Sequence, residues 1–70
     1  MLVITDNYII RGTDNNVFKY IVAYKKAYNI VDTDITINDI LNILNAENAL
    51  QKSSDDFDIT IMEIKLPAWL

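Results

Sequence analysis

A chain of 70 residues that contains neither cysteine nor histidine has to fold without the two common ways of holding a small domain together. No disulfide can form, and a structural zinc site needs Cys or His ligands. A domain of this size buries only about 60% of the surface that its unfolded chain exposes. We therefore expect a dense aliphatic core, to which twelve isoleucines contribute, and burial against another chain in a homo-oligomer.

The same absences restrict the chemistry open to the chain. Acid–base catalysis would depend on Asp, Glu, Lys or Tyr with strongly shifted pKa values, and a nucleophilic serine would lack an imidazole base. The single glycine excludes a P-loop and a dinucleotide-binding fingerprint. The aspartates in 32–34 and 55–58 lack the glycine and the spacing of a calcium loop. The sequence predicts a protein that is not an enzyme and binds no metal or cofactor.

Charge and hydropathy limit the partners. The net charge of −4 argues against a basic surface for nucleic acid or for an anionic membrane. Seven of the ten carboxylates lie in residues 34–70, so one end of the fold is expected to be acidic. No stretch reaches the ~20 apolar residues of a membrane span. We expect a cytoplasmic protein, or one of the host cytoplasm for a viral chain, because cysteine-free chains suit a reducing compartment.

The N-terminal part of the chain favours a hairpin. Residues 2–11 and 17–26 alternate loosely and are rich in β-branched and aromatic residues, which favours strands. Residues 12–16 (Gly-Thr-Asp-Asn-Asn) form the strongest turn signal, because Gly and Asn tolerate positive φ. We predict a hairpin over 2–26 with a loop of about five residues. An alternative stays open for 17–31: a helix capped by Thr13 or Asp14, with apolar residues at helical spacing at Val17, Ile21, Tyr24, Tyr28 and Val31.

The second half predicts a helix and then a strand. Thr36 is a suitable N-cap, with Asp39 in the first turn, and the apolar spacing predicts a helix over 37–51 that the Ser-Ser-Asp-Asp of 53–56 interrupts. The polar side chains of this helix fall on the side opposite its apolar face, at Asn38, Asn42, Asn45 and Lys52. Residues 57–66 predict a strand that is apolar on both faces and that Pro67 ends.

These elements predict one domain over residues 1–70 with the order β-β-α-β. The fold class is α+β: a small antiparallel sheet with one helix packed on one face. A strand that is apolar on both faces lies in the centre of a sheet or is buried by a partner.

The candidate binding residues are aromatic or acidic. Phe18, Tyr20, Tyr24 and Tyr28 interleave with lysines, and this pattern fits a core face under the helix, a protein interface or a stacking platform for single-stranded nucleic acid. Trp69 lies in an apolar tail that either folds back on the core or inserts into a neighbour. The acidic loop, which could imitate a row of phosphates, comprises Asp55, Asp56 and Asp58.

The sequence thus favours a small acidic protein-binding module. The working hypothesis is a phage or mobile-element inhibitor that binds a larger host protein, such as a nucleic-acid-processing or defence enzyme. Its contacts would come from Tyr20, Tyr24, Tyr28, the 55–58 loop and Trp69. One alternative is a structural protein that pairs with itself, using the two-sided apolar strand over 57–66 to extend a sheet across a dimer. A second is the single-stranded nucleic-acid platform.

Overall fold

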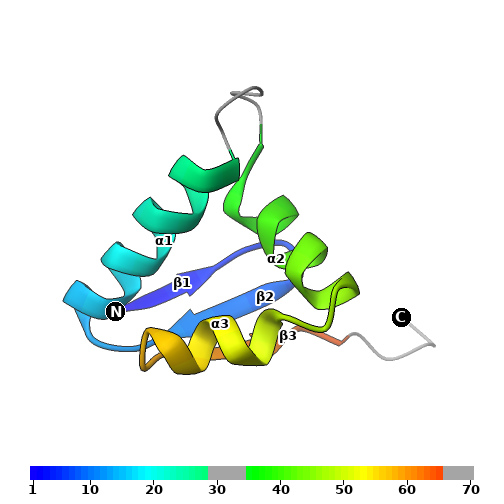
Figure 1. Ribbon diagram of the computed structural model, residues 1–70. Helices are drawn as coiled ribbons and strands as arrows, with labels where there is room; N and C mark the ends of the chain where they lie inside the picture. The colour runs from blue at the N-terminus through cyan, green and yellow to red at the C-terminus, as the bar shows by residue number, and fades with distance from the viewer. Residues whose placement is uncertain (29–34, 66–70) are drawn as a thin grey trace.

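The computed structural model describes residues 1–28 and 35–65, which form a three-stranded sheet covered by three helices. The elements in chain order are β1 (Leu2–Ile4), β2 (Tyr8–Arg11), α1 (Asp14–Tyr28), α2 (Ile37–Ala46), α3 (Leu50–Asp56) and β3 (Thr60–Glu63). The strands are antiparallel in the order β1-β2-β3 (Figure 1). The α+β class with a small antiparallel sheet is confirmed, whereas the single helix and the β-β-α-β order are wrong, because three helices separate β2 from β3.

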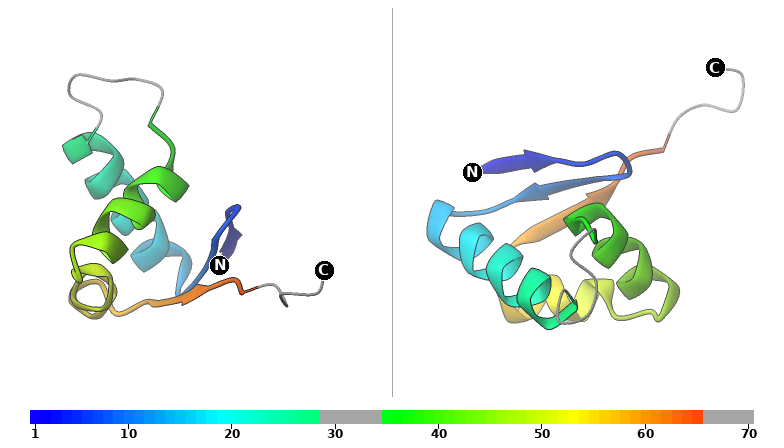
Figure 2. Two further views of the ribbon diagram at one scale, coloured as in Figure 1. Left: turned by 90° about the vertical axis from the view of Figure 1, so that its right-hand side faces the viewer. Right: turned by 90° about the horizontal axis from the view of Figure 1, so that it is seen from above.

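All three helices lie on one side of the sheet, which makes a two-layer structure with one open sheet face (Figure 2). The side chains buried between the layers are Tyr8, Ile10, Val17, Tyr20, Ile40, Leu41, Leu44 and Ile59. They come from both layers and from the segment before β3. This arrangement positions the outer face of the sheet away from the core.

The N-terminal hairpin turns earlier than predicted. Ile4 lies opposite Ile9, so the turn falls at residues 6–7, and the hairpin comprises only β1 and β2. The Thr5 N–H donates to the Tyr8 carbonyl at 2.8 Å, and the Thr5 hydroxyl accepts from the Tyr8 N–H at 3.0 Å. A threonine side chain therefore closes a turn in which no residue has a positive φ. The predicted hairpin over 2–26 is wrong.

Residues 14–28 form a helix, as the alternative interpretation of this segment predicted. The Thr13 hydroxyl accepts from the Asn16 N–H at 3.2 Å, which is the N-cap contact. Val17 and Tyr20 are fully buried on the inner face of α1. The β-branched and aromatic residues of this segment do not form a strand, because strand propensity mainly reflects side-chain packing on a sheet. Here the same side chains pack from a helix. Residues 29–34, where the predicted pattern continued to Val31, lie outside the described residues.

Gly12 is needed for space and not for a turn. Its φ is not positive, contrary to the prediction. A Cβ at this position would lie 2.8 Å from Ile59 Cγ2 and 3.2 Å from Val17 Cγ2. Only a residue without a side chain lets the chain pass between α1 and the segment before β3.

The predicted helix over 37–51 is divided in two. Its start is confirmed: Thr36 and Asp39 form a reciprocal capping box. It ends at Ala46, after which Asn48 has φ 58° and the Ala49 N–H donates to the Leu44 carbonyl at 2.8 Å. This is a Schellman motif, which allows the chain to turn and start α3.

The predicted break at 53–56 is therefore wrong, because these residues belong to α3. A second Schellman motif ends α3, where Asp58 has φ 53° and the Ile59 N–H donates to the Ser54 carbonyl at 3.0 Å. The strand predicted over 57–66 shortens to β3, and Phe57 caps the helix instead. Leu66 and Pro67 lie outside the described residues.

Two asparagines expected on the polar side of the helix bind the hairpin instead. The Asn38 carboxamide accepts from the Thr5 hydroxyl at 2.7 Å and from the Asn7 N–H at 2.9 Å. It also donates to the Asn7 side chain at 3.0 Å. The Tyr8 hydroxyl donates to Asn42 at 3.0 Å. Polar contacts thus fix the angle between α2 and the sheet.

Candidate functional site: the open face of the sheet

The open sheet face is apolar, which is unusual for a face that no described helix covers. In an antiparallel sheet, directly opposed residues point to the same side, so the register assigns each residue to a face. The first outward row runs Leu2–Arg11–Thr60, and the second runs Ile4–Ile9–Met62. Four of these six side chains are apolar. One-sided antiparallel sheets normally carry polar residues on the solvent side.

The exposure of these residues is large. Ile4 is 66% exposed, Leu2 57% and Met62 42%. The inward apolar residues of the strands are buried or half-buried, and Ile10 is fully buried, whereas the inward Glu63 at the end of β3 is exposed. The strands therefore carry apolar residues on both sides of the sheet, and the described helices cover only the inner side.

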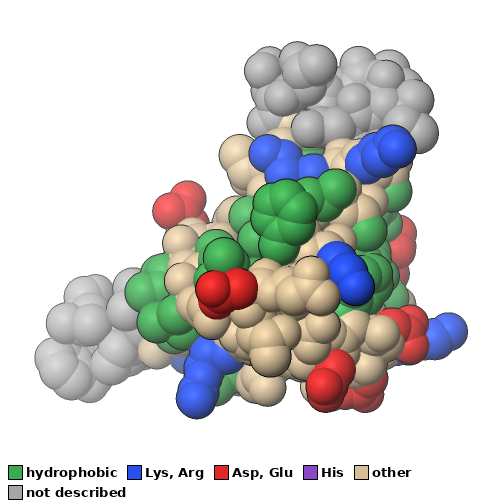
Figure 3. Space-filling view, turned by 90° about the vertical axis from the view of Figure 1, so that its left-hand side faces the viewer, with side chains coloured by type: hydrophobic (Ala, Val, Ile, Leu, Met, Phe, Trp, Pro, Cys, Tyr) green, Lys and Arg blue, Asp and Glu red, His purple; other side chains and the backbone are tan. Residues whose placement is uncertain are grey.

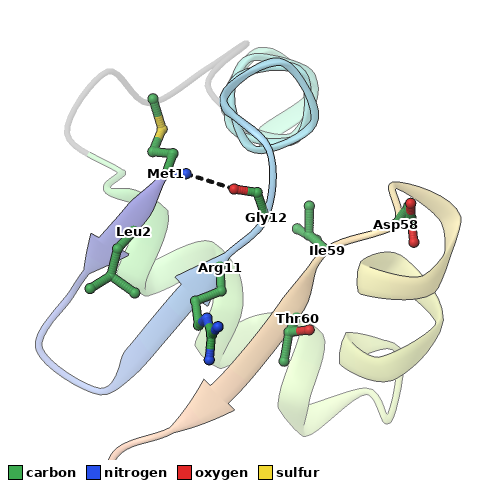
Figure 4. Close-up of a pocket in the computed structure, with 7 residues that line it drawn as sticks. All are labelled: Met1, Leu2, Arg11, Gly12, Asp58, Ile59 and Thr60. Atoms are coloured by element: carbon green, nitrogen blue, oxygen red, sulfur yellow. Dashed lines mark hydrogen bonds between the residues drawn. The ribbon is translucent and has the colours of Figure 1, made fainter.

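An open pocket of about 670 Å³ lies at the end of this face where Arg11 is located. Leu2, Arg11 and Thr60 lie side by side across the three strands, with Arg11 in the middle (Figure 4). Asp58, at the end of α3, lines the same pocket. Gly12 and Ile59 also line it, and so does Met1, whose amino group donates to the Gly12 carbonyl at 2.6 Å.

Among the six outward side chains of the described strands, Arg11 is the only charged one. Within residues 1–28 and 35–65, no carboxylate forms an ion pair with its guanidinium group. Glu63 lies opposite Tyr8, which is buried, so Glu63 belongs to the inner side of the sheet. The two outward rows therefore combine apolar side chains with one cationic side chain, on a chain whose net charge is −4.

The predicted tyrosines form a cluster between α1 and α3 and not a surface array on a sheet. The ring centroids of Tyr20 and Tyr24 are 4.6 Å apart, and those of Tyr20 and Phe57 are 5.2 Å apart in edge-to-face geometry. Tyr24 and Tyr28 are half-buried against the core, while Tyr20 is fully buried. Tyr20 therefore has no accessible surface in this fold. The stacking platform would need these rings exposed on a sheet, and the structure places them on a helix.

The Tyr20 hydroxyl lies in a buried polar chain. It is 2.8 Å from the Ser53 hydroxyl, which donates to the Leu50 carbonyl at 2.7 Å. Ser53 therefore accepts from Tyr20. Burial raises the pKa of Tyr20 to about 12, because the phenolate would lose its hydration. Burial also raises the pKa of Tyr24, and the nearby charge of Asp56 adds to this effect.

The acidic residues of the predicted site lie together at the C-terminal end of α3. Asp55, Asp56 and Asp58 are all exposed, and Asp55 accepts from the Gln51 carboxamide at 2.9 Å. Asp56 approaches the tyrosine cluster and Asp58 borders the open sheet face. The structure thus brings the acidic residues close to both other candidate groups. Trp69 lies outside the described residues.

A second exposed apolar group lies on the outer side of α1. Phe18 is 62% exposed and Val22, one turn later, is 46% exposed. The exposed lysines of the same helix are Lys19, Lys25 and Lys26. Figure 3 shows hydrophobic side chains on this side of the molecule with basic side chains around them. This group is smaller than the open sheet face and lies on a single helix.

Three properties of the described residues bear on chemistry and on membranes. Their acidic side chains contain no cluster of three that could hold a metal ion. The hydroxyls of Ser53 and Ser54 are buried and donate to the backbone carbonyls of Leu50 and Gln51. Of the helices in these two segments, none has the length and hydropathy needed to cross a bilayer.

No protein-family model, curated protein or solved structure matches the chain. The sequence singled out one strand of the open sheet face, the two-sided apolar segment over 57–66, but not the two strands of the hairpin. A signal for them was present: residues 2–4 and 8–11 carry apolar side chains at both parities of the strand. Such a pattern requires burial on both sides of the sheet.

Proposed function

We propose that this protein is a non-enzymatic protein-binding module that docks through its open sheet face. The observation that carries the proposal is the apolar outer surface of the sheet, with Leu2, Ile4 and Met62 each more than 40% exposed. Contiguous exposed apolar surface on a small protein is typical of an interaction site. Association that buries these side chains removes them from water and stabilises the complex.

The acidic end of α3 extends this surface. Asp58 borders the pocket at one end of the sheet, and Asp55 and Asp56 precede it on the last turn of α3. A partner that covers the sheet can therefore also meet this group of carboxylates. This combination suits an inhibitor of a larger host protein, such as a nucleic-acid-processing or defence enzyme whose basic groove normally receives phosphates. A phage or mobile element is the source that fits this activity.

The test compares two aspartate substitutions in affinity capture from the native host. Ile4→Asp places a charge in the open face, whereas Val22→Asp places the same charge on the outer side of α1. Both native residues are exposed, so both variants should keep the wild-type circular dichroism spectrum. We expect the first variant to lose the captured protein more than tenfold and the second to retain it. Equal capture by wild type and Ile4→Asp would exclude the open face as the binding surface.

Self-association is the second candidate function. It would use β3, the described part of the predicted strand over 57–66, because β1 and β3 each pair only with β2 among the described strands and are edge strands. β1 has only three residues and β3 four, however, and short edge strands offer few ladder hydrogen bonds. Sedimentation equilibrium at high micromolar concentration separates the two candidates. A dimer favours self-association, and a strict monomer excludes self-association and favours the binding module.

A further inference from the structure

The dimensions of the open sheet face restrict what can cover it. Three strands spaced by about 4.8 Å give a face about 14 Å wide, and four residues at about 3.3 Å each give a length of about 13 Å. The area is therefore roughly 200 Å². A stable interface buries about 800 Å² of accessible surface on each partner, so two copies stacked through this face alone fall short, and a larger partner must also contact surface beyond it.

A single α-helix matches this face in width and length. Its diameter with side chains is about 10–12 Å, and three turns extend about 16 Å. A helix also completes a standard architecture, in which a sheet that is apolar on both faces carries helices on both sides. An added edge strand would leave the exposed side chains of the face uncovered, because it pairs beside the sheet and not across it.

The charge of the face determines the second property of this helix. Arg11 lies at the centre of its row, flanked by Leu2 and Thr60. Its guanidinium forms no ion pair with a carboxylate of the described residues. A helix that lies over Leu2 and Ile4 and covers Arg11 would leave a desolvated cation unless it supplies a carboxylate. The guanidinium group binds a carboxylate with two parallel hydrogen bonds.

From these observations we infer that the open sheet face binds one amphipathic helix of a partner protein, whose apolar stripe covers Leu2, Ile4, Ile9 and Met62 and whose carboxylate pairs with Arg11. This inference rests on the proposed function and specifies the partner segment. It also makes a prediction opposite to that of the net charge. A chain of charge −4 attracts basic peptides in general, whereas Arg11 selects a carboxylate on this helix, and basic groups elsewhere on the partner would meet Asp58 and its neighbours.

The experiment uses two synthetic 16-residue helical peptides with one leucine stripe. The residues that flank the stripe are glutamates in one peptide and lysines in the other. Binding is followed by amide chemical shifts of the full-length protein. We expect the glutamate peptide to bind more tightly than the lysine peptide, with shifts concentrated at residues 2–4, 9–11 and 60–62. Arg11→Glu should weaken the binding of the glutamate peptide about threefold to tenfold, so that the lysine peptide binds more tightly than the glutamate peptide.

Lys25→Glu is the matched control, because it changes the net charge by the same two units on the exposed side of α1. It should leave the preference for the glutamate peptide unchanged. A preference of the wild type for the lysine peptide would overturn the inference, as would shifts centred on Phe18 and Val22.

Other occupants of the face give distinct results, each of which overturns the inference. A dimer in sedimentation that Ile4→Asp abolishes identifies a second copy as the occupant. Shifts at residues 2–4 and 60–62 of the free protein on Trp69→Ala identify the chain's own C-terminal segment. If neither peptide binds but Ile4→Asp still abolishes capture of the host partner, the helix inference fails and the proposed function stands. If Ile4→Asp captures the partner normally, the proposed function itself fails.

Discussion

The buried hydroxyl of Tyr20 predicts a specific dependence of stability on pH. Its pKa is raised from 10.0 to about 12 in the folded protein. The unfolded chain therefore loses this proton first as the pH rises. The contribution of the neutral phenol to stability is complete below pH 10 and is lost as the pH rises through 12. Two pKa units correspond to a total loss of about 2.7 kcal/mol, of which about 1.4 kcal/mol is lost by pH 11.

Tyr20→Phe isolates this effect. At pH 7 the variant loses the hydrogen bond to Ser53 and should be less stable by about 1 kcal/mol, because the buried Ser53 oxygen loses its donor. The variant cannot form a phenolate at position 20, so its free energy of unfolding does not show the decrease above pH 10 that Tyr20 causes in the wild type. The free energies of unfolding of the two proteins should therefore cross near pH 11, above which the variant is the more stable.

Urea denaturation from pH 7 to pH 11.5, followed by far-UV circular dichroism, measures both curves. Ser53→Ala serves as the control, because it removes the same hydrogen bond and keeps the ionisable phenol of Tyr20. Like the wild type, this variant should lose stability as the pH rises above 10. Parallel curves for Tyr20→Phe and wild type up to pH 11.5 would refute the proposed cost of burying the phenolate.

Three further substitutions test the packing that forms the fold. Gly12→Ala should lower the free energy of unfolding by about 1–3 kcal/mol, because its Cβ would lie 2.8 Å from Ile59 Cγ2, and Ile59→Leu in the same chain should recover part of the loss in thermal melts. Asn48→Gly should raise the free energy of unfolding by up to about 1 kcal/mol in urea titrations, since glycine adopts the φ of 58° without strain. Asn38→Ala should lower it by about 1–3 kcal/mol and increase amide hydrogen exchange in the hairpin turn, whereas the exposed Asn45→Ala should be nearly neutral.

Local signals were informative wherever a few adjacent residues determine the structure. The Thr36 capping box predicted the start of α2, because the hydroxyl and the carboxylate it needs are three residues apart. Thr13 as a cap and the apolar spacing of residues 17–31 likewise predicted the helix α1, as one of two alternatives for this segment. The choice between strand and helix depended on packing partners that lie 30 or more residues away, such as Ser53 for Tyr20.

The candidate site was less accessible to sequence reasoning. The enrichment of aromatic residues at interfaces favours the tyrosines as contact residues, yet Tyr20 is buried in the core. A short apolar strand ordinarily indicates a core, so the sequence does not distinguish the exposed Leu2 and Ile4 from buried strand residues. Their exposure follows from the placement of all three described helices on one side of the sheet (Figure 2).

The sequence by itself determined that the chain has no disulfide and no thiol or imidazole group, since it contains neither cysteine nor histidine. It also determined a mixed α+β fold with an antiparallel sheet, because apolar spacing and capping residues are local. Only the tertiary structure decided which apolar residues are buried. Burial depends on where distant helices pack, and here they cover one face of a sheet whose strands are apolar on both.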